Sequence, residues 1–257
     1  MTEKEMIVNN FKIRYSERRE NGCDVFVFLH GWGTSEKLFS PIYKNLDNYL
    51  SIDFPGFGGS SDIEKPLTLF DYAKLINMVI NTKLNEEKII FVVHSFGGRV
   101  LLKLLTEYDI KNIKSIICIS VPFIRSRNYR HNVINIVTKI FGFIFLFLPR
   151  FLSNLAKTFW YKIIGSNDYL ELENDVMRKT FINIINEDVF KMSDVLKRYK
   201  TFFIWGDDDR ETPLNSAKVV SQKVGAELYI IKNGGHFPFV GSTTNEFMKI
   251  FKQIIKI

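Results

Sequence analysis

The stretch VVHSFGGRV, residues 92–100, decides the fold, because it joins an apolar run to a helical pattern through one serine and two glycines. Residues 88–94 (KIIFVVH) are apolar and β-branched, which predicts a buried strand, and residues 98–108 have helical spacing. Ser95 therefore falls at a strand-to-helix turn. A turn this tight strains its apical residue and leaves no room for a side chain two residues later, where Gly97 stands. We expect the Ser95 hydroxyl to project from the carboxyl end of a sheet, where ligands bind in open α/β folds.

Short apolar runs between turn signals recur on both sides of this stretch and predict further strands. They are FKIRY (11–15), DVFVFLH (24–30), YLSIDF (49–54), IKSIICISV (113–121), TFFIW (201–205) and ELYIIK (227–232). Between them lie amphipathic stretches, of which residues 68–84 and 243–256 are predicted helices. Alternation of strands and helices predicts an α/β fold with a doubly wound, mostly parallel sheet of about eight strands.

The alternation stops between residues 123 and 200, where the pattern is helical throughout. An ordinary crossover takes about a dozen or two residues, far fewer than this interval holds. We therefore predict a core domain made of residues 1–122 and 201–257, with a helical cap inserted at residues 123–200.

The formal net charge of +7 is concentrated in one part of this insertion. From Phe123 to Gly165 there are seven Lys or Arg residues and no Asp or Glu. This pattern favours an anionic partner, either an anionic amphiphile as substrate or the surface of a membrane. The alternative is codon bias and a solvated face. The longest apolar run, residues 140–148, is too short for a transmembrane segment, which needs about 20 residues.

Other classes of function find little support in the composition. Two cysteines without a CxxC spacing indicate neither a disulfide framework nor a metal site, and we expect no cofactor. No recognised nucleic-acid module is present. The N-terminal 20 residues are charged and lack the apolar core of a signal peptide, so we expect a cytoplasmic protein. A monomer and a dimer fit the sequence equally well.

Four further motifs occur in order around the serine turn. They are His30-Gly31-Trp32-Gly33, Asp53-Phe54-Pro55-Gly56-Phe57-Gly58-Gly59-Ser60, Trp205-Gly206-Asp207-Asp208-Asp209 with Pro213, and Gly235-His236-Phe237-Pro238. Together with Val93-His94-Ser95-Phe96-Gly97 they resemble the α/β-hydrolase superfamily, although Val93 stands where the G-x-S-x-G elbow has its first glycine. The turn at residues 53–60 has a mainly structural role in that superfamily.

The resemblance implies a role for several residues. Ser95 is the expected nucleophile, Asp209 the orienting acid and His236 the base, in the chain order of that superfamily. The backbone N–H groups of Trp32 and Phe96 are the expected oxyanion hole. The chemistry needs these residue types, because a serine hydroxyl is a poor nucleophile until an imidazole, oriented by a carboxylate, accepts its proton.

Each assignment has an alternative. Asp207 or Asp208 can be the acid, and Ser95 can be a turn serine without a chemical role. Of the other histidines, His94 is expected to line the turn and His131 to be exposed on a helix of the insertion.

The predicted function is a serine hydrolase, similar to carboxylesterases, that cleaves a small or medium-chain carboxylic ester or thioester through an acyl-enzyme. His30, Phe123, Trp160 and Phe237 are candidates for the pocket of this small-molecule substrate. The aromatic residues of the insertion either cover the acyl chain or form the cap's own core.

Two alternatives remain open. One is hydrolysis of a carbon–carbon bond in a vinylogous diketone, and the other is a small-ligand receptor or regulator that keeps the triad without turnover. Ser95 argues against the epoxide hydrolases and haloalkane dehalogenases of this fold, which have Asp at that position.

Overall fold

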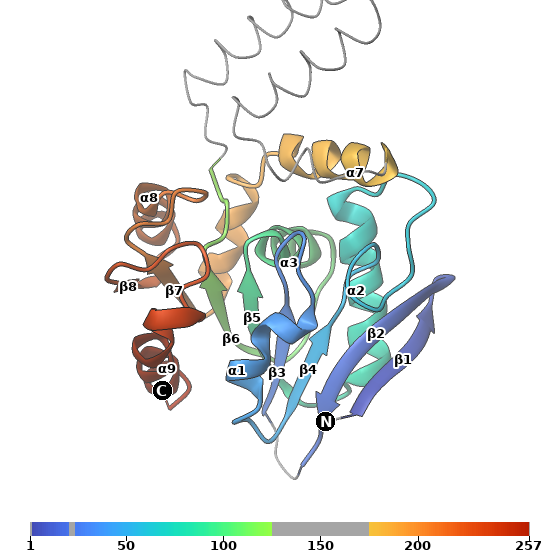
Figure 1. Cartoon of the computed structure of the whole chain (residues 1–257), viewed down its shortest axis with the longest axis horizontal. Coiled ribbons are helices and arrows are strands. Elements are labelled where there is room, and N and C mark those ends of the chain that lie inside the picture. Colours follow the sequence, from blue (N-terminus) through green and yellow to red (C-terminus); the bar gives the residue numbers. More distant parts are fainter. Residues whose placement is uncertain (1, 21–23, 125–174, 257) are drawn as a thin grey trace, which may run out of the picture.

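Eight strands form one sheet in the part of the chain that the structure describes, which is residues 2–20, 24–124 and 175–256 of a computed structural model (Figure 1). The strands are β1 (Thr2–Val8), β2 (Phe11–Arg18), β3 (Asp24–Leu29), β4 (Tyr49–Ile52), β5 (Lys88–His94), β6 (Ile113–Ile119), β7 (Thr201–Gly206) and β8 (Glu227–Ile231). Their order is β1-β2-β4-β3-β5-β6-β7-β8, with antiparallel pairing at β1–β2 and β2–β4 and parallel pairing from β4 to β8. The prediction of a mostly parallel sheet is confirmed.

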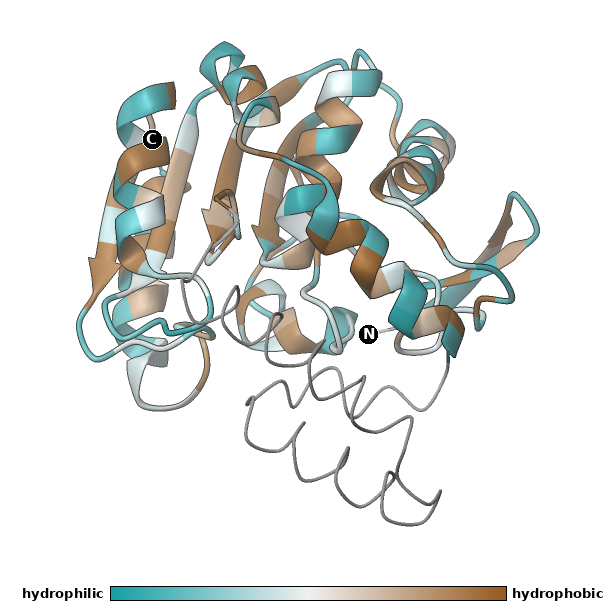
Figure 2. Ribbon diagram, turned by 90° about the horizontal axis from the view of Figure 1, so that it is seen from above, coloured by the Kyte–Doolittle hydropathy of each residue, from teal (hydrophilic) through white to brown (hydrophobic). Residues whose placement is uncertain are grey.

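Helices cover both faces of this sheet, and the central strands are mostly hydrophobic (Figure 2). The helices are α1 (Ser40–Tyr43), α2 (Leu69–Lys83), α3 (Phe96–Glu107), α7 (Asp175–Asn186), α8 (Leu214–Val224) and α9 (Thr244–Ile254), with short 3-10 helices η1 (Glu36–Phe39), η2 (Met192–Arg198) and η3 (Gly241–Thr243).

Alternate residues of β3 belong to two separate cores. Val25, Val27 and Leu29 pack in the core that includes side chains of α2, α3 and α8. Phe26 and Phe28 pack in a second core with side chains of α1 and α9. Both faces of the strand are therefore buried, which explains why its sequence is apolar at nearly every position. Each fully buried side chain of this size contributes about 1.5–3 kcal/mol.

The start of α2 shows how the local sequence defines a helix. Thr68 and Asp71 form a capping box, in which the Thr68 hydroxyl accepts the Asp71 N–H and the Asp71 carboxylate accepts the Thr68 N–H. The buried stripe of the helix contains Leu69, Tyr72 and Ile76. The helix predicted at residues 68–84 is thus confirmed, and so is the helix predicted at the C-terminal end.

Only part of the predicted cap lies within the described residues. In residues 175–200 the structure has α7 and η2 and no strand, while residues 125–174 lie outside the described part, so the extent of the cap stays a prediction. α7 crosses the edge of the sheet toward which β5 and β6 point (Figure 1). None of the helices in the described ranges is long and apolar enough to cross a membrane.

Arg99 of α3 connects the segment after β6 to the end of α7. Its guanidinium donates to the carbonyl oxygens of Pro122 at 2.9 Å, Ile184 at 2.7 Å and Glu187 at 2.6 Å. Pro122 follows β6, and the other two carbonyls belong to the end of α7 and the residues after it. A side chain four residues after Ser95 therefore holds these two segments near the serine turn.

Candidate active site

Ser95 lies at the turn between β5 and α3 with a strained backbone. Its φ of 48° and ψ of −112° fall in a region that non-glycine residues rarely adopt, which costs about 1–3 kcal/mol. The N–H of Ser95 donates to the carbonyl oxygen of Ile119 at 3.0 Å, which fixes the turn against β6. A Cβ added at Gly97 would lie 2.2 Å from the carbonyl oxygen of Leu29. The predicted strand–turn–helix is confirmed, and glycine is needed two residues after the serine because α3 approaches the backbone of β3.

His236 lies beside the aspartate that the sequence favours. Its Nδ1 is 3.1 Å from Oδ2 and 3.2 Å from Oδ1 of Asp209. Asp209 is buried, whereas Asp207 and Asp208 are exposed. Asp209, rather than either of its neighbours, is therefore the carboxylate next to this imidazole.

Asp209 is held by more than the imidazole. Its carboxylate accepts the N–H of Glu211 at 3.0 Å, the N–H of Thr212 at 2.8 Å and the Thr212 hydroxyl at 2.6 Å. Burial alone would raise the pKa of Asp209, but the hydrogen bonds from His236 and Thr212 outweigh burial and lower the pKa below its ordinary value. The group is therefore a carboxylate at neutral pH and accepts the Nδ1–H of His236.

Ser95 and His236 line the same cavity. The described lining also includes Trp32 from the loop after β3, Phe181 from α7 and Phe237 from the loop after β8. The cavity thus opens at the carboxyl edge of the sheet, below α7.

The second nitrogen of His236 makes no hydrogen bond to the serine among the described residues. The hydrogen bonds of the described residues include none from Ser95 Oγ to His236, and His236 Nε2 instead lies 3.4 Å from Oε2 of Glu211. Catalytic hydrogen bonds are often loose before a substrate binds, and Ser95 and His236 line the same cavity. The hydrogen bond between Ser95 Oγ and His236 Nε2 must form before a proton passes between them.

Two main-chain N–H groups border the same site. Trp32 lies in the loop after β3, and Phe96 is the first residue of α3, where a helix has no acceptor for its N–H. Neither N–H donates to another residue of the described ranges. The rings of Trp32 and Phe96 pack edge to face with centroids 5.5 Å apart, which keeps the two segments together. Donors placed in this way can stabilise a developing oxyanion.

Two other histidines are buried and uncharged. His30 Nε2 accepts the N–H of Phe54 at 3.1 Å, its Nδ1 donates to the carbonyl oxygen of Gly31 at 2.7 Å, and burial lowers its pKa to about 4. His94 Nε2 donates to the carbonyl oxygen of His236 at 2.9 Å, and burial lowers its pKa to about 3. His30 therefore links two loops, and His94 fixes the main chain of His236.

The four candidate pocket residues have different positions. Phe237 lines the cavity that contains Ser95. His30 is not in the described lining, and Phe123 is buried in the core, stacked on Phe203 with centroids 4.9 Å apart. Trp160 lies outside the described residues, as does His131.

The structure adds residues that the sequence did not single out. Phe181 reaches the cavity from α7, and Glu211 and Thr212 reach it from the segment after Asp209. The position of Glu211 and Thr212 between Asp209 and Pro213 was the available signal for these two. In the described part of the chain, no group of three or more His, Cys, Asp or Glu side chains is placed to hold a metal ion.

Comparisons with known proteins agree with this architecture. Residues 24–243 match the model of a family described as the alpha/beta hydrolase fold. Lipase 1 of Psychrobacter immobilis is 23% identical over 95% of this chain and 82% of its own length. Pimeloyl-[acyl-carrier protein] methyl ester esterase of Shewanella woodyi is 36% identical, but over 32% of this chain and 30% of its own. The structure of an esterase from Exiguobacterium antarcticum has a TM-score of 0.72 at 21% identity, covering 98% of both chains.

Proposed function

The chain belongs to the α/β-hydrolase fold family and is an esterase-like hydrolase, and from this premise we propose that it cleaves carboxylic esters or thioesters of small or medium-chain acids through an acyl-enzyme on Ser95. One observation carries the proposal. Ser95, on its strained turn, faces the same cavity as His236, whose Nδ1 is bound by the buried carboxylate of Asp209. This is the arrangement that activates a serine hydroxyl.

The first half of the reaction forms the acyl-enzyme. Ser95 Oγ attacks the carbonyl carbon of the ester while its proton passes to Nε2 of His236, and the Asp209 carboxylate stabilises the imidazolium. The oxyanion of the tetrahedral intermediate accepts hydrogen bonds from the N–H groups of Trp32 and Phe96. When the intermediate collapses, the bond to the alcohol oxygen breaks and that oxygen takes the proton from Nε2.

The second half releases the acid. A water molecule gives a proton to Nε2 of His236 and attacks the acyl carbon, and a second tetrahedral intermediate collapses to return the proton to Ser95 Oγ. Before each attack, His236 must exchange its contact with Glu211 for one with the attacking oxygen.

The described lining of the cavity suits the acyl chain of an ester. Trp32, Phe181 and Phe237 provide an apolar surface for such a chain. The cationic residues on which a preference for an anionic amphiphile rests lie outside the described residues, so that preference stays a prediction. The same holds for a cytoplasmic location.

Steady-state turnover tests the proposal. p-Nitrophenyl esters with acyl chains from acetyl to dodecanoyl are hydrolysed by the wild type and by Ser95→Ala, with Ser242→Ala as a control because Ser242 is exposed in η3, outside the cavity. We expect kcat to fall by at least about a thousandfold in Ser95→Ala and to stay unchanged in the control. Equal turnover by Ser95→Ala and the wild type would refute the role of Ser95. A wild type that turns over no ester of the series would favour the receptor alternative.

A further inference from the structure

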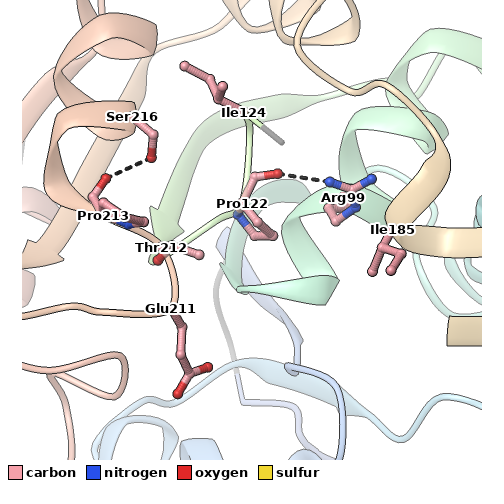
Figure 3. Close-up of a pocket in the computed structure, with 8 residues that line it drawn as sticks. All are labelled: Arg99, Pro122, Ile124, Ile185, Glu211, Thr212, Pro213 and Ser216. Atoms are coloured by element: carbon pink, nitrogen blue, oxygen red, sulfur yellow. Dashed lines mark hydrogen bonds between the residues drawn. The ribbon is translucent and has the colours of Figure 1, made fainter. Parts of the chain in front are cut away.

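Thr212 lies on the loop that joins β7 to α8, between the catalytic cavity and a neighbouring pocket (Figure 3). It belongs to the lining of both spaces, yet the residue is only 5% exposed. Its main chain is fixed, because the indole Nε1–H of the buried Trp205 donates to the Thr212 carbonyl oxygen at 2.7 Å. A buried threonine with a fixed main chain can hold its hydroxyl in one position at the edge of the cavity.

The Thr212 hydroxyl has one proton to donate and three polar neighbours. Its Oγ1 lies 2.6 Å from Oδ2 of Asp209, but 3.4 Å from the carbonyl oxygen of Ser120 and 3.4 Å from Nδ1 of His236. Hydroxyl donors bind carboxylates at about 2.5–2.7 Å, so the proton is donated to Asp209. The hydroxyl therefore lies directly beside the hydrogen bond that joins Asp209 to His236.

The two carboxylate oxygens of Asp209 are held in different ways. Oδ1 accepts the main-chain N–H groups of Glu211 at 3.0 Å and Thr212 at 2.8 Å. Among the described residues, Oδ2 accepts only from the Thr212 hydroxyl and from Nδ1 of His236, which is 3.1 Å away. The Asp209 side chain is fully buried, so solvent does not reach Oδ2 to replace a lost donor. Without the hydroxyl, the oxygen that orients the imidazole would be held by the imidazole alone.

We propose that Thr212 is a positioning residue for catalysis, whose hydroxyl fixes Oδ2 of Asp209 so that His236 keeps the orientation in which Nε2 reaches Ser95. This inference rests on the proposed ester hydrolysis. Thr212 acts through Asp209 and neither gives nor takes a proton in the reaction. Proton transfer needs its donor and acceptor within hydrogen-bond distance, so a carboxylate that turns lets the imidazole turn and slows both halves of the reaction.

Turnover of p-nitrophenyl butyrate by Thr212→Val and Thr212→Ser tests the role of the hydroxyl. Valine keeps the shape of threonine and loses the donor, whereas serine keeps the donor. We expect kcat to fall about tenfold to a hundredfold in Thr212→Val with KM within about twofold of the wild type, and kcat of Thr212→Ser to stay within about threefold. If Thr212→Val does not fold, the comparison of Thr212→Ala with Thr212→Ser isolates the same hydroxyl.

Thr201→Val is the matched control. Thr201 is also 5% exposed, and its hydroxyl donates to the carbonyl oxygen of Tyr199 at 3.1 Å. It begins β7, at the end of that strand opposite to Gly206 and the loop that carries Asp209. Thr201→Val therefore also removes a buried hydroxyl, but kcat should be unchanged.

A double-mutant cycle with Asp209→Asn separates positioning from a general packing defect. If the hydroxyl acts through the carboxylate, Thr212→Val should lower kcat by less than about twofold in the Asp209→Asn protein. A packing defect would lower kcat by the same factor in both backgrounds. That result, or equal kcat values of the wild type and Thr212→Val, would overturn the proposal, while Ser95-dependent hydrolysis would still stand. Hydrolysis that persists in Ser95→Ala would overturn both.

Discussion

Two buried histidines should make the protein lose stability between pH 7 and pH 5. Burial lowers the pKa of His30 to about 4 and of His94 to about 3, from 6.5 for an exposed histidine. Below pH 6.5 the unfolded chain binds protons at both residues, whereas the folded protein leaves them neutral. The stability that comes from keeping them neutral is therefore present above pH 6.5 and is lost as the pH falls toward the folded-state values.

The loss of unfolding free energy depends on how far the pH lies below about 6.5, the pKa of an exposed histidine. Each pH unit below 6.5 costs about 1.4 kcal/mol per histidine, so each residue costs about 2 kcal/mol at pH 5 and the two together about 4 kcal/mol. Glu36 acts in the opposite direction, because burial raises its pKa and the folded protein takes up that proton first. The pKa of Asp209 is lowered, so its contribution is lost only at pH values below this interval.

Urea unfolding followed by tryptophan fluorescence measures the effect, since Trp205 is fully buried. We expect the free energy of unfolding to fall between pH 7 and pH 5 in the wild type. In His94→Gln this fall should be about 2 kcal/mol smaller, and Glu36 cancels from that comparison. A pH dependence that is the same in His94→Gln and in the wild type would refute the reasoning.

Three other substitutions test separate parts of the structure. Gly97→Ala should destabilise the protein by at least about 3 kcal/mol, because the added Cβ would meet the main-chain oxygen of Leu29. Gly235→Ala is the control, since a Cβ there has no heavy atom within 4 Å. Equal melting temperatures of the two variants would contradict this reasoning. Asp209→Asn should lower kcat by about 10,000-fold and Asp208→Asn should not, and equal kcat values would reassign the acid. Arg99→Met loses three hydrogen bonds to carbonyl oxygens and should reduce the free energy of unfolding by about 3 kcal/mol; a change below about 1 kcal/mol would argue against its connecting role.

Local sequence was sufficient for the central part of the fold. The turn at Ser95 follows from one strand meeting one helix that are adjacent in sequence. The glycine at position 97 was also predictable from that turn, although the structure shows that the contact requiring it comes from Leu29 of β3, far away in sequence. β1 was missed because its first half, residues 2–5, is polar and charged and only residues 6–8 are apolar, too short a run to predict a strand by itself. Its pairing with β2, rather than its own apolar content, makes it a strand.

Site residues were predictable where a motif fixes their spacing in the sequence. They were not predictable where tertiary packing decides whether a side chain lines the cavity or lies in the core. Asp209 was favoured over its neighbours by spacing alone, and the structure adds the reason, since it is the buried one of the three. Phe123 was a candidate for the pocket, but its ring turns into the core beside Phe203, a choice that residues far apart in sequence decide. For Glu211 the only signal was its position between Asp209 and Pro213, because an acidic residue in a loop is usually solvated.

Covalent labelling of Ser95 tests the central claim most directly. The wild type is treated with a fluorophosphonate, digested, and analysed by mass spectrometry, alongside Ser95→Ala and His236→Asn. We expect one phosphonyl group per chain, located on Ser95, with labelling abolished in Ser95→Ala and slowed at least about a hundredfold in His236→Asn, because the imidazole accepts the serine proton. No adduct on Ser95, or labelling at the same rate in His236→Asn, would contradict the account.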